Sequence, residues 1–382
     1  MENALERIFV ADYEVDYSDV IGKKIECPEG CGLCCLCQPE VLPDERLFFR
    51  ENYPRDLVKS RGSNPYYALA LKKGHGSCVF LDNCTRKCKV YDNRTTYCKQ
   101  YPFHIYVSDR VKVELDLSCR GVWYGTGNDA LTEAKGIVEK ADKRIVKALV
   151  EAKDVYRQFY ANCKESGIMA DQSTIRMSLS ENLTNFTDLA YLSKVMDLSE
   201  LEPVMTLDGL QKESKVEMAD LEDAAREAAM DSMATNDPLC APVYCDENWN
   251  WNVFMASGDK IDWTVLDDEG NINLKNSAHV SGIPLKPLEE GGEKVLADYI
   301  ATLNHRDSFM GSVFSLIDSN EYEDNMANAY YGCMSTTILD LMWRASMLDH
   351  FMGTGMGSKG MQEAIIFYDM DRLDAQAIGA FV

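Results

Sequence analysis

Apolar residues recur at the spacing of an α-helix through most of the chain after residue 127. Residues 129–166 carry Ile137, Ile145 and Leu149 at this spacing, and Gly167 is a natural stop. The same pattern predicts helices over five later ranges, namely 181–196, 288–304, 308–317, 324–350 and 360–377. The chain is therefore expected to be mainly helical.

One stretch with a different pattern interrupts these helices. Residues 249–255, 261–266 and 272–279 are strand-like, and Ser-Gly-Asp and Asp-Asp-Glu-Gly sequences between them supply turns. This arrangement predicts a small antiparallel β-meander. Together with the helices, it predicts the α+β fold class with helix dominant.

Charge is distributed unevenly along the chain. The 382 residues carry 39 Lys and Arg against 62 Asp and Glu, a net charge of −23. Residues 1–127 hold 18 basic and 18 acidic side chains, so the whole excess lies beyond them. So acidic a chain is a poor candidate for binding nucleic acid or an anionic membrane surface. No apolar stretch is long enough for a membrane span, and the acidic N-terminus is unlike a secretory signal, so we expect a cytoplasmic protein.

Cysteine density changes at the same place as charge, since ten of the 14 cysteines lie within residues 1–119. We therefore expect three parts. The first, 1–127, is an irregular cysteine-cluster metal-binding domain. An acidic helical region over 128–238 follows, and then a small antiparallel sheet with helices over 239–382. Within the second part, 197–237 is acidic enough to be a linker or a solvated face, with some helix.

Three chemistries compete to explain the cysteines. Disulfides suit small secreted domains rather than a large chain without a secretory signal. Inert burial suits isolated residues such as Cys163 and Cys333, but not five cysteines within the eleven residues 27–37. Closely spaced thiols that converge on a metal ion or cluster explain the pattern best.

The sequence around the cysteines is distinctive. It opens with Cys27-Pro-Glu-Gly-Cys31-Gly-Leu-Cys34-Cys35 and continues with Cys78-Val-Phe-Leu, Cys88-Lys-Val-Tyr-Asp-Asn-Arg94, Cys98-Lys-Gln-Tyr-Pro-Phe and Cys119-Arg-Gly. Over residues 27–127 this order of motifs resembles the YkgJ-type cysteine-cluster family, the CxxCxxCC zinc- or iron-chelating domain, which also occurs in flagellin lysine N-methylases. The resemblance implies that this part of the chain binds metal.

The positions shared with the family pattern define the expected site. The resemblance implies metal ligation by Cys27, Cys31, Cys34, Cys35, Cys78, Cys88, Cys98 and Cys119. Arg94 also belongs to the motif and is expected to bind the cofactor region by donating hydrogen bonds to sulfur or backbone. Thr95 and Lys99 replace the family's proline and arginine, but neither position is a thiol. The roles of four further cysteines stay open: Cys37, Cys84, Cys240 and Cys245.

Eight thiols suit one or two four-ligand sites for zinc or iron. Zinc ribbons show two separate CxxC knuckles, whereas the crowded opening and the long reach to Cys119 favour an iron–sulfur cluster, [4Fe-4S] in particular. The Cys27-x3-Cys31-x2-Cys34 spacing is also that of radical S-adenosylmethionine enzymes. Here, however, a second cysteine group follows instead of the β/α units of a barrel.

The leading functional prediction is a cytosolic iron–sulfur (or zinc) cluster-binding protein with a redox, sensory or scaffold role in a complex with a protein partner. The resemblance alone implies one alternative, a protein lysine N-methylase with S-adenosylmethionine as cofactor. A second alternative is a zinc-stabilised interaction module. No residue of the sequence identifies a catalytic role, so whether the protein is an enzyme stays open.

Overall fold

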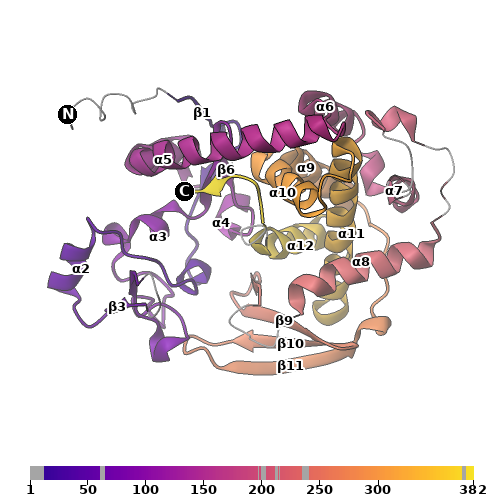
Figure 1. The fold of residues 1–382 in the computed structure, drawn as a ribbon. Coiled ribbons are helices and arrows are strands. Elements are labelled where there is room, and N and C mark those ends of the chain that lie inside the picture. The colour runs from indigo at the N-terminus through magenta and orange to yellow at the C-terminus, as the bar shows by residue number, and fades with distance from the viewer. Residues whose placement is uncertain are drawn as a thin grey trace, which may run out of the picture.

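The computed structural model of the protein describes residues 13–60, 65–196, 198, 204–210, 214, 216–234, 241–371 and 376–382. These residues form a mainly helical α+β fold (Figure 1), which confirms the predicted fold class. The α-helices among them are α2 (Arg46–Asn52), α3 (Thr96–Gln100), α4 (Arg120–Trp123), α5 (Ala130–Glu165), α6 (Gln172–Glu181), α7 (Leu189–Met196), α8 (Met218–Met233), α9 (Gly292–His305), α10 (Asp307–Ser319), α11 (Met326–Met352) and α12 (Ser358–Asp371).

One four-stranded sheet joins the two ends of the described chain. Its strand order is β1 (Val15–Asp16), β6 (Val111–Leu115), β5 (Phe103–Val107) and β12 (Ala380–Phe381). β1 runs parallel to β6, whereas β5 is antiparallel to both β6 and β12. The C-terminal strand, the yellow arrow in Figure 1, thus completes a sheet whose other strands come from the first 115 residues.

The long helix α5 covers this sheet (Figure 1). It begins at Ala130 because the Asp129 carboxylate caps it, accepting a hydrogen bond from the Thr132 amide at 2.9 Å. Ala134, Ala141 and Ile145 lie on one side of the helix at helical spacing, and all three are buried in a cluster with the apolar residues of β5 and β6. Burial of this face holds α5 on the sheet.

The predicted meander is present and has one additional strand. β8 (Val243–Cys245), β9 (Trp251–Ser257), β10 (Lys260–Leu266) and β11 (Ile272–His279) form an antiparallel sheet in the order β11-β10-β9-β8. In Figure 1 the sheet lies beneath α8, and α12 packs against β8.

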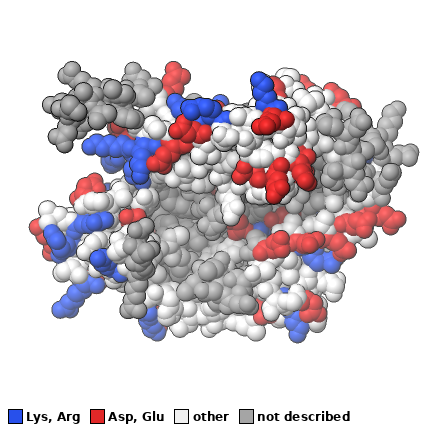
Figure 2. Space-filling model, viewed as in Figure 1, with Lys and Arg blue, Asp and Glu red and all other residues white. Residues whose placement is uncertain are grey.

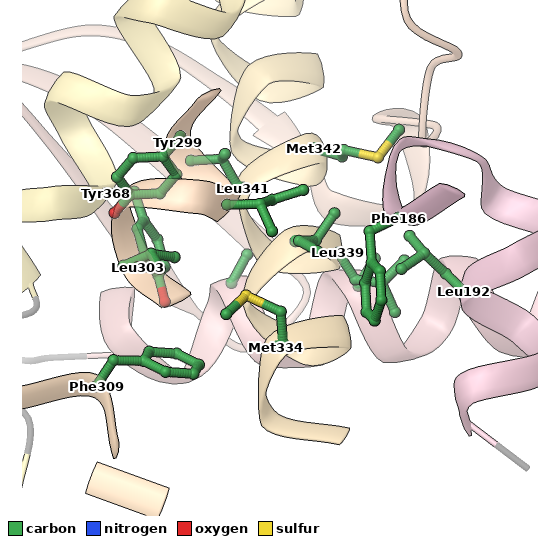
Figure 3. Packing of buried hydrophobic residues seen from close by; sticks show 14 of the residues in the cluster. Phe186, Leu192, Tyr299, Leu303, Phe309, Met334, Leu339, Leu341, Met342 and Tyr368 are labelled. Atoms are coloured by element: carbon green, nitrogen blue, oxygen red, sulfur yellow. The ribbon is translucent and has the colours of Figure 1, made fainter. Parts of the chain in front are cut away.

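The largest core is built around α11, which is buried on nearly all sides. Figure 3 shows Leu339 of this helix facing Phe186 and Leu192, which come from the segment containing α7. On another side, the rings of Tyr299 in α9 and Tyr368 in α12 lie 6.3 Å apart, edge to face. A helix that is apolar on all faces is expected at the centre of a helical core.

The cysteine-rich segment has little regular structure. Its two ends meet in the antiparallel pair of β2 (Lys24–Ile25) and β7 (Asn128–Asp129), and a second short antiparallel pair, β3 (Leu57–Lys59) with β4 (Tyr67–Leu69), lies within it. Its own apolar clusters are small compared with the core around α11. The predicted irregular character of this segment is therefore observed.

Two predicted helices differ from the structure. The range 360–377 corresponds to α12, which ends at Asp371, and residues 376 and 377 are not helical. Residues 181–196 were expected to be continuous, but α6 ends at Glu181 and α7 begins at Leu189. The side chain of Asn182 donates to the Ser178 carbonyl, and the Asp188 carboxylate accepts from the Ala190 amide. Such local bonds end one helix and begin the next.

The predicted domain boundaries at 127 and 238 stay predictions. Packing runs across both: α5 shares its core with β5 and β6, and β8 lies against the cysteine segment. Part of the acidic stretch 197–237 forms α8 as expected, and most of the remainder lies outside the described residues.

Acidic side chains gather on the face over α8, whereas Lys and Arg side chains are frequent at the end that holds α2 and β3 (Figure 2). This matches the charge step along the sequence. Within the part of the chain that the structure describes, no helix combines the length and the apolar character needed to cross a membrane.

Candidate metal centre

All eight predicted ligand cysteines line one cavity of about 440 Å³. The cavity-lining cysteines are Cys27, Cys31, Cys34, Cys35, Cys37, Cys78, Cys88, Cys98 and Cys119. Arg94 lines the same cavity. The structure thus brings together side chains that are up to 92 positions apart in the sequence, although ligation itself stays a prediction.

The first cysteine group follows β2 and turns into a short 3₁₀-helix (Leu33–Cys35). Gly32 precedes this turn with a φ of 60°, and a Cβ at this position would lie 3.1 Å from the Trp251 ring. Glycine therefore suits both the left-handed conformation and the close packing. A hydrogen bond of 2.7 Å from the Cys78 amide to the Cys35 carbonyl ties the second cysteine group to the first.

The later cysteines are placed by local hydrogen bonds. Cys88 forms an isolated β-bridge with Leu81. Cys98 lies in α3, where the Thr95 hydroxyl accepts a hydrogen bond from its amide at 3.3 Å and caps the helix. The replacement of the family's proline by Thr95 therefore keeps a helix start at this position. Cys119 immediately precedes α4.

Burial makes most of these thiols poor acids. It raises the pKa of Cys27 and Cys98 to about 11 and that of Cys78 to about 12. The pKa of Cys119 is also well above its usual value, chiefly because of burial. These groups therefore hold protons at neutral pH until a cation replaces them, and metal binding would release those protons.

Cys31 behaves differently because of a partner outside the motif. Its Sγ lies 3.9 Å from the Sγ of Cys245, and this hydrogen bond is the main reason that the pKa of Cys31 falls to about 7. The same contact raises the pKa of Cys245. Of the two thiols, Cys31 loses its proton first.

Four cationic side chains line the cavity: Arg86, Lys87, Arg94 and Lys99. The Arg94 guanidinium lies 3.8 Å from the centre of the Tyr91 ring and donates a 3.1 Å hydrogen bond to the Tyr91 carbonyl. Its charge lowers the pKa of Cys27, Cys88 and Cys98, opposing the larger effect of burial. Arg94 thus donates to backbone and favours the thiolate form of these cysteines. Its predicted role toward a bound cofactor stays a prediction.

The four cysteines left open by the sequence have separate locations. Cys37 is exposed and lines the cavity, whereas Cys84 is exposed and is absent from the described lining. Cys245 is fully buried against Cys31. Cys240 lies outside the described residues. Sequence reasoning missed the contact of Cys245, because no spacing rule links positions 31 and 245.

Residues of β8 and β9 pack against one side of the cysteine segment. The indole nitrogen of Trp251 donates a 2.8 Å hydrogen bond to the Cys31 carbonyl, and Arg86 stacks on the same indole at 4.0 Å. Arg120, next to Cys119, donates to the Cys245 carbonyl at 2.5 Å. The segment is therefore held against residues 245–251 of the second sheet.

The donor set fits an all-thiolate metal group. Thiolates bind zinc and iron–sulfur clusters, and the cavity offers more of them than a single four-ligand site uses. Across the described ranges, no three or more Cys, His, Asp or Glu side chains are already arranged to hold a metal ion. The thiols surround the cavity rather than meeting at one point.

Comparison with known proteins agrees with this chemistry. Residues 26–120 match the CxxCxxCC family model, described as "Putative zinc- or iron-chelating domain". The resemblance seen in the sequence is thus confirmed over this segment, and a metal-binding cysteine domain is supported. An uncharacterized protein of Methanocaldococcus jannaschii is 28% identical over 149 residues, which cover 34% of this chain and 82% of that protein. No solved structure matches. Nothing in these comparisons supports S-adenosylmethionine binding.

Proposed function

We propose that the chain, whose residues 26–120 match a zinc- or iron-chelating domain, binds an iron–sulfur cluster in the cysteine-lined cavity. The observation that carries the proposal is the convergence of nine cysteines on one space of about 440 Å³. A [4Fe-4S] cluster takes four thiolates, so the cavity has enough ligands for one cluster and spare thiols beside it.

The spacing of the cysteines favours a cluster over a lone zinc ion. Zinc ribbons commonly carry two separate CxxC knuckles. Here the cavity-lining thiols come from a crowded opening at Cys27–Cys37 and from positions as distant as Cys119. This arrangement is more typical of cluster ligation.

The surroundings also suit a negatively charged thiolate cluster. Arg86, Lys87, Arg94 and Lys99 supply positive charge along the wall, and Leu33, Phe80 and Val90 supply apolar surface. Positive charge stabilises thiolates, while an apolar wall limits access of water. When bound, an iron–sulfur cluster supplies one-electron redox chemistry or a rigid crosslink; the chain's own residues bind it, orient it and shield it.

The proposal extends to a redox, sensory or scaffold role in a cytosolic complex with a protein partner. The acidic surface of the C-terminal part supports a protein rather than a nucleic acid as partner, because a charge excess of this sign repels phosphates. The match to a chelating domain supports binding as the primary activity of residues 26–120.

Anaerobic purification followed by counting iron, sulfide and zinc per chain tests the proposal. We expect about four iron and four sulfide per chain and broad absorbance at about 400 nm that fades on reduction. Zinc in place of iron, without this absorbance, would support the zinc-stabilised module instead. A chain that holds neither metal after reconstitution with iron and sulfide, or with zinc, contradicts metal binding altogether.

A further inference from the structure

Cys245 lies outside the segment that matches the chelating domain, yet its thiol contacts that segment. Its Sγ is 3.9 Å from the Sγ of Cys31, and both residues are free cysteines. Among the described residues that line the cavity, Cys31 is present and Cys245 is not. Cys245 is fully buried, in a cluster with Leu33, Leu81 and Trp251. Its thiol therefore lies behind Cys31 rather than in the cavity wall.

The backbone on both sides of this contact is fixed by buried donors. Trp251 donates to the Cys31 carbonyl at 2.8 Å, and Arg120 donates to the Cys245 carbonyl at 2.5 Å. The Arg120 guanidinium is itself paired with Glu363 of α12, and both side chains are buried. The two sulfur atoms are thus positioned by the fold and not by a flexible loop.

We infer that Cys245 is a positioning residue of the metal centre, whose S–H donates a hydrogen bond to the metal-bound sulfur of Cys31. The inference rests on the proposed function. A thiolate bound to a metal carries no proton, so in the loaded protein only Cys245 can be the donor of this pair. The metal centre then extends beyond residues 26–120 to β8 of the C-terminal sheet.

One other acceptor competes for the Cys245 proton. The Asp246 carbonyl lies at the same 3.9 Å from the Cys245 sulfur. A ligated thiolate carries negative charge and the carbonyl is neutral, so the bond to Cys31 is the stronger of the two. Metal binding at Cys31 therefore orients the S–H group of Cys245 toward the Cys31 sulfur rather than toward the Asp246 carbonyl.

A hydrogen bond of this kind acts on how firmly the metal group is held and on its potential. Partners that orient a ligand typically contribute 10–100-fold in metal affinity, and hydrogen bonds to the sulfurs help to set the reduction potential of a cluster. The effect differs from that of a ligand, because the number of metal ions per chain stays the same when the donor is removed.

The test compares Cys245→Ala, Cys245→Ser and Cys163→Ala in the full chain, purified without oxygen. The readouts are metal per chain and the rate of metal release to a colorimetric chelator, which serves iron and zinc alike. We expect Cys245→Ala to keep its metal stoichiometry but to release metal at least about ten times faster. Cys245→Ser, which retains a donor, should lie closer to the parent protein. Cys163→Ala is the control, because this buried cysteine in α5 does not line the cavity in the described residues.

Three outcomes overturn the inference. Release from Cys245→Ala at the parent rate shows that the contact has no effect on the centre. Loss of metal stoichiometry in folded Cys245→Ser, judged by circular dichroism, makes Cys245 a ligand rather than a positioning residue. A parent protein that holds no metal contradicts both the inference and the proposed function. A parent protein that holds metal, together with a Cys245→Ala variant that releases it at the parent rate, contradicts the inference alone.

Discussion

Arg120 and Glu363 form a buried ion pair that connects the cysteine segment to α12. The guanidinium donates to both carboxylate oxygens, one of them at 3.0 Å, and the two side chains are only 5% and 4% exposed. Arg120 directly follows Cys119, the last cysteine of the cavity. The pair therefore fixes the closing end of the candidate site to a helical residue that lies 243 positions later in the sequence.

Replacing Arg120 with methionine should destabilise the protein by about 3–5 kcal/mol, because it leaves the Glu363 carboxylate buried without its partner. The double variant Arg120→Met/Glu363→Leu should recover part of this loss, since it removes both buried charges. Urea unfolding measures both. Arg157→Ala is the control, because Arg157 pairs with Asp154 on the exposed surface of α5, where ion pairs contribute about 0–1 kcal/mol. Equal losses in Arg120→Met and Arg157→Ala would contradict the importance of the buried pair.

Replacing Cys88 or Cys98 with alanine should lower the metal bound per chain. Both residues line the cavity, and ligation should supply much of the folding free energy of a segment with so small an apolar core. Each variant should therefore also unfold at a lower temperature than the loaded parent. Metal analysis after anaerobic purification and thermal unfolding by circular dichroism check the two effects.

The matched controls are Cys163→Ala and Cys333→Ala, whose cysteines lie in α5 and α11 and do not line the cavity in the described residues. They should keep full metal content. Full metal content in Cys88→Ala and Cys98→Ala as well would leave disulfides or core packing as the explanation for the cysteines.

Much of the helical fold was predictable because local signals agreed. The range 129–166 differs from α5 by one residue at each end, since the apolar spacing and the stop at Gly167 agree. The hairpin of β5 and β6 was not predicted, although β6, Val-Lys-Val-Glu-Leu, alternates apolar and polar residues as a half-exposed strand does. Its polar residues Lys112 and Glu114 are nevertheless buried, because Lys112 donates to the His305 carbonyl and Glu114 accepts from the Asp307 amide.

The residues of the candidate site also fall into a group that the sequence predicts and a group that it does not. The grouping of the cysteines around one cavity was predictable because short spacings and motif order constrain where they meet. The contributions of Cys245, Trp251 and Glu363 were not, because they depend on how β8, β9 and α12 pack against the cysteine segment. Packing between distant parts of a chain leaves no periodic trace in its sequence.

Acid should destabilise the protein partly through Asp307, the first residue of α10. Burial alone would raise the pKa of this carboxyl, but the hydrogen bonds from Arg110, both at 2.6 Å, and the charge of Arg176 lower it below the usual value. A carboxyl group whose pKa is lowered in the folded state contributes its full stabilisation at pH values above its unfolded pKa, which is about 3.9 for Asp. This stability is lost as the pH falls through the lower folded value.

Urea midpoints measured between neutral pH and about pH 3 test this expectation. Asp307→Asn should be less stable than the parent at neutral pH, and the difference should shrink as the pH falls toward the folded pKa. Asp154→Asn, on the exposed surface of α5, is the control and should change the profile little. A constant difference between Asp307→Asn and the parent at every pH would show that packing rather than charge accounts for the loss.

Two glycine-to-alanine changes should have opposite effects. At Gly121 a Cβ would lie 1.8 Å from the carbonyl oxygen of Glu26, so alanine must push away the backbone that leads into Cys27. At Gly136, within α5, a Cβ would meet no atom within 4 Å. Gly121→Ala should therefore cost about 1–3 kcal/mol through overpacking, and it should weaken metal retention because Cys27 moves with Glu26. Gly136→Ala should stabilise the helix by up to about 1 kcal/mol and leave the metal content unchanged. Urea unfolding and metal analysis distinguish the two. If Gly121→Ala keeps parent stability and metal, the contact of the Cys119–Gly121 turn with the first cysteine group does not position the site.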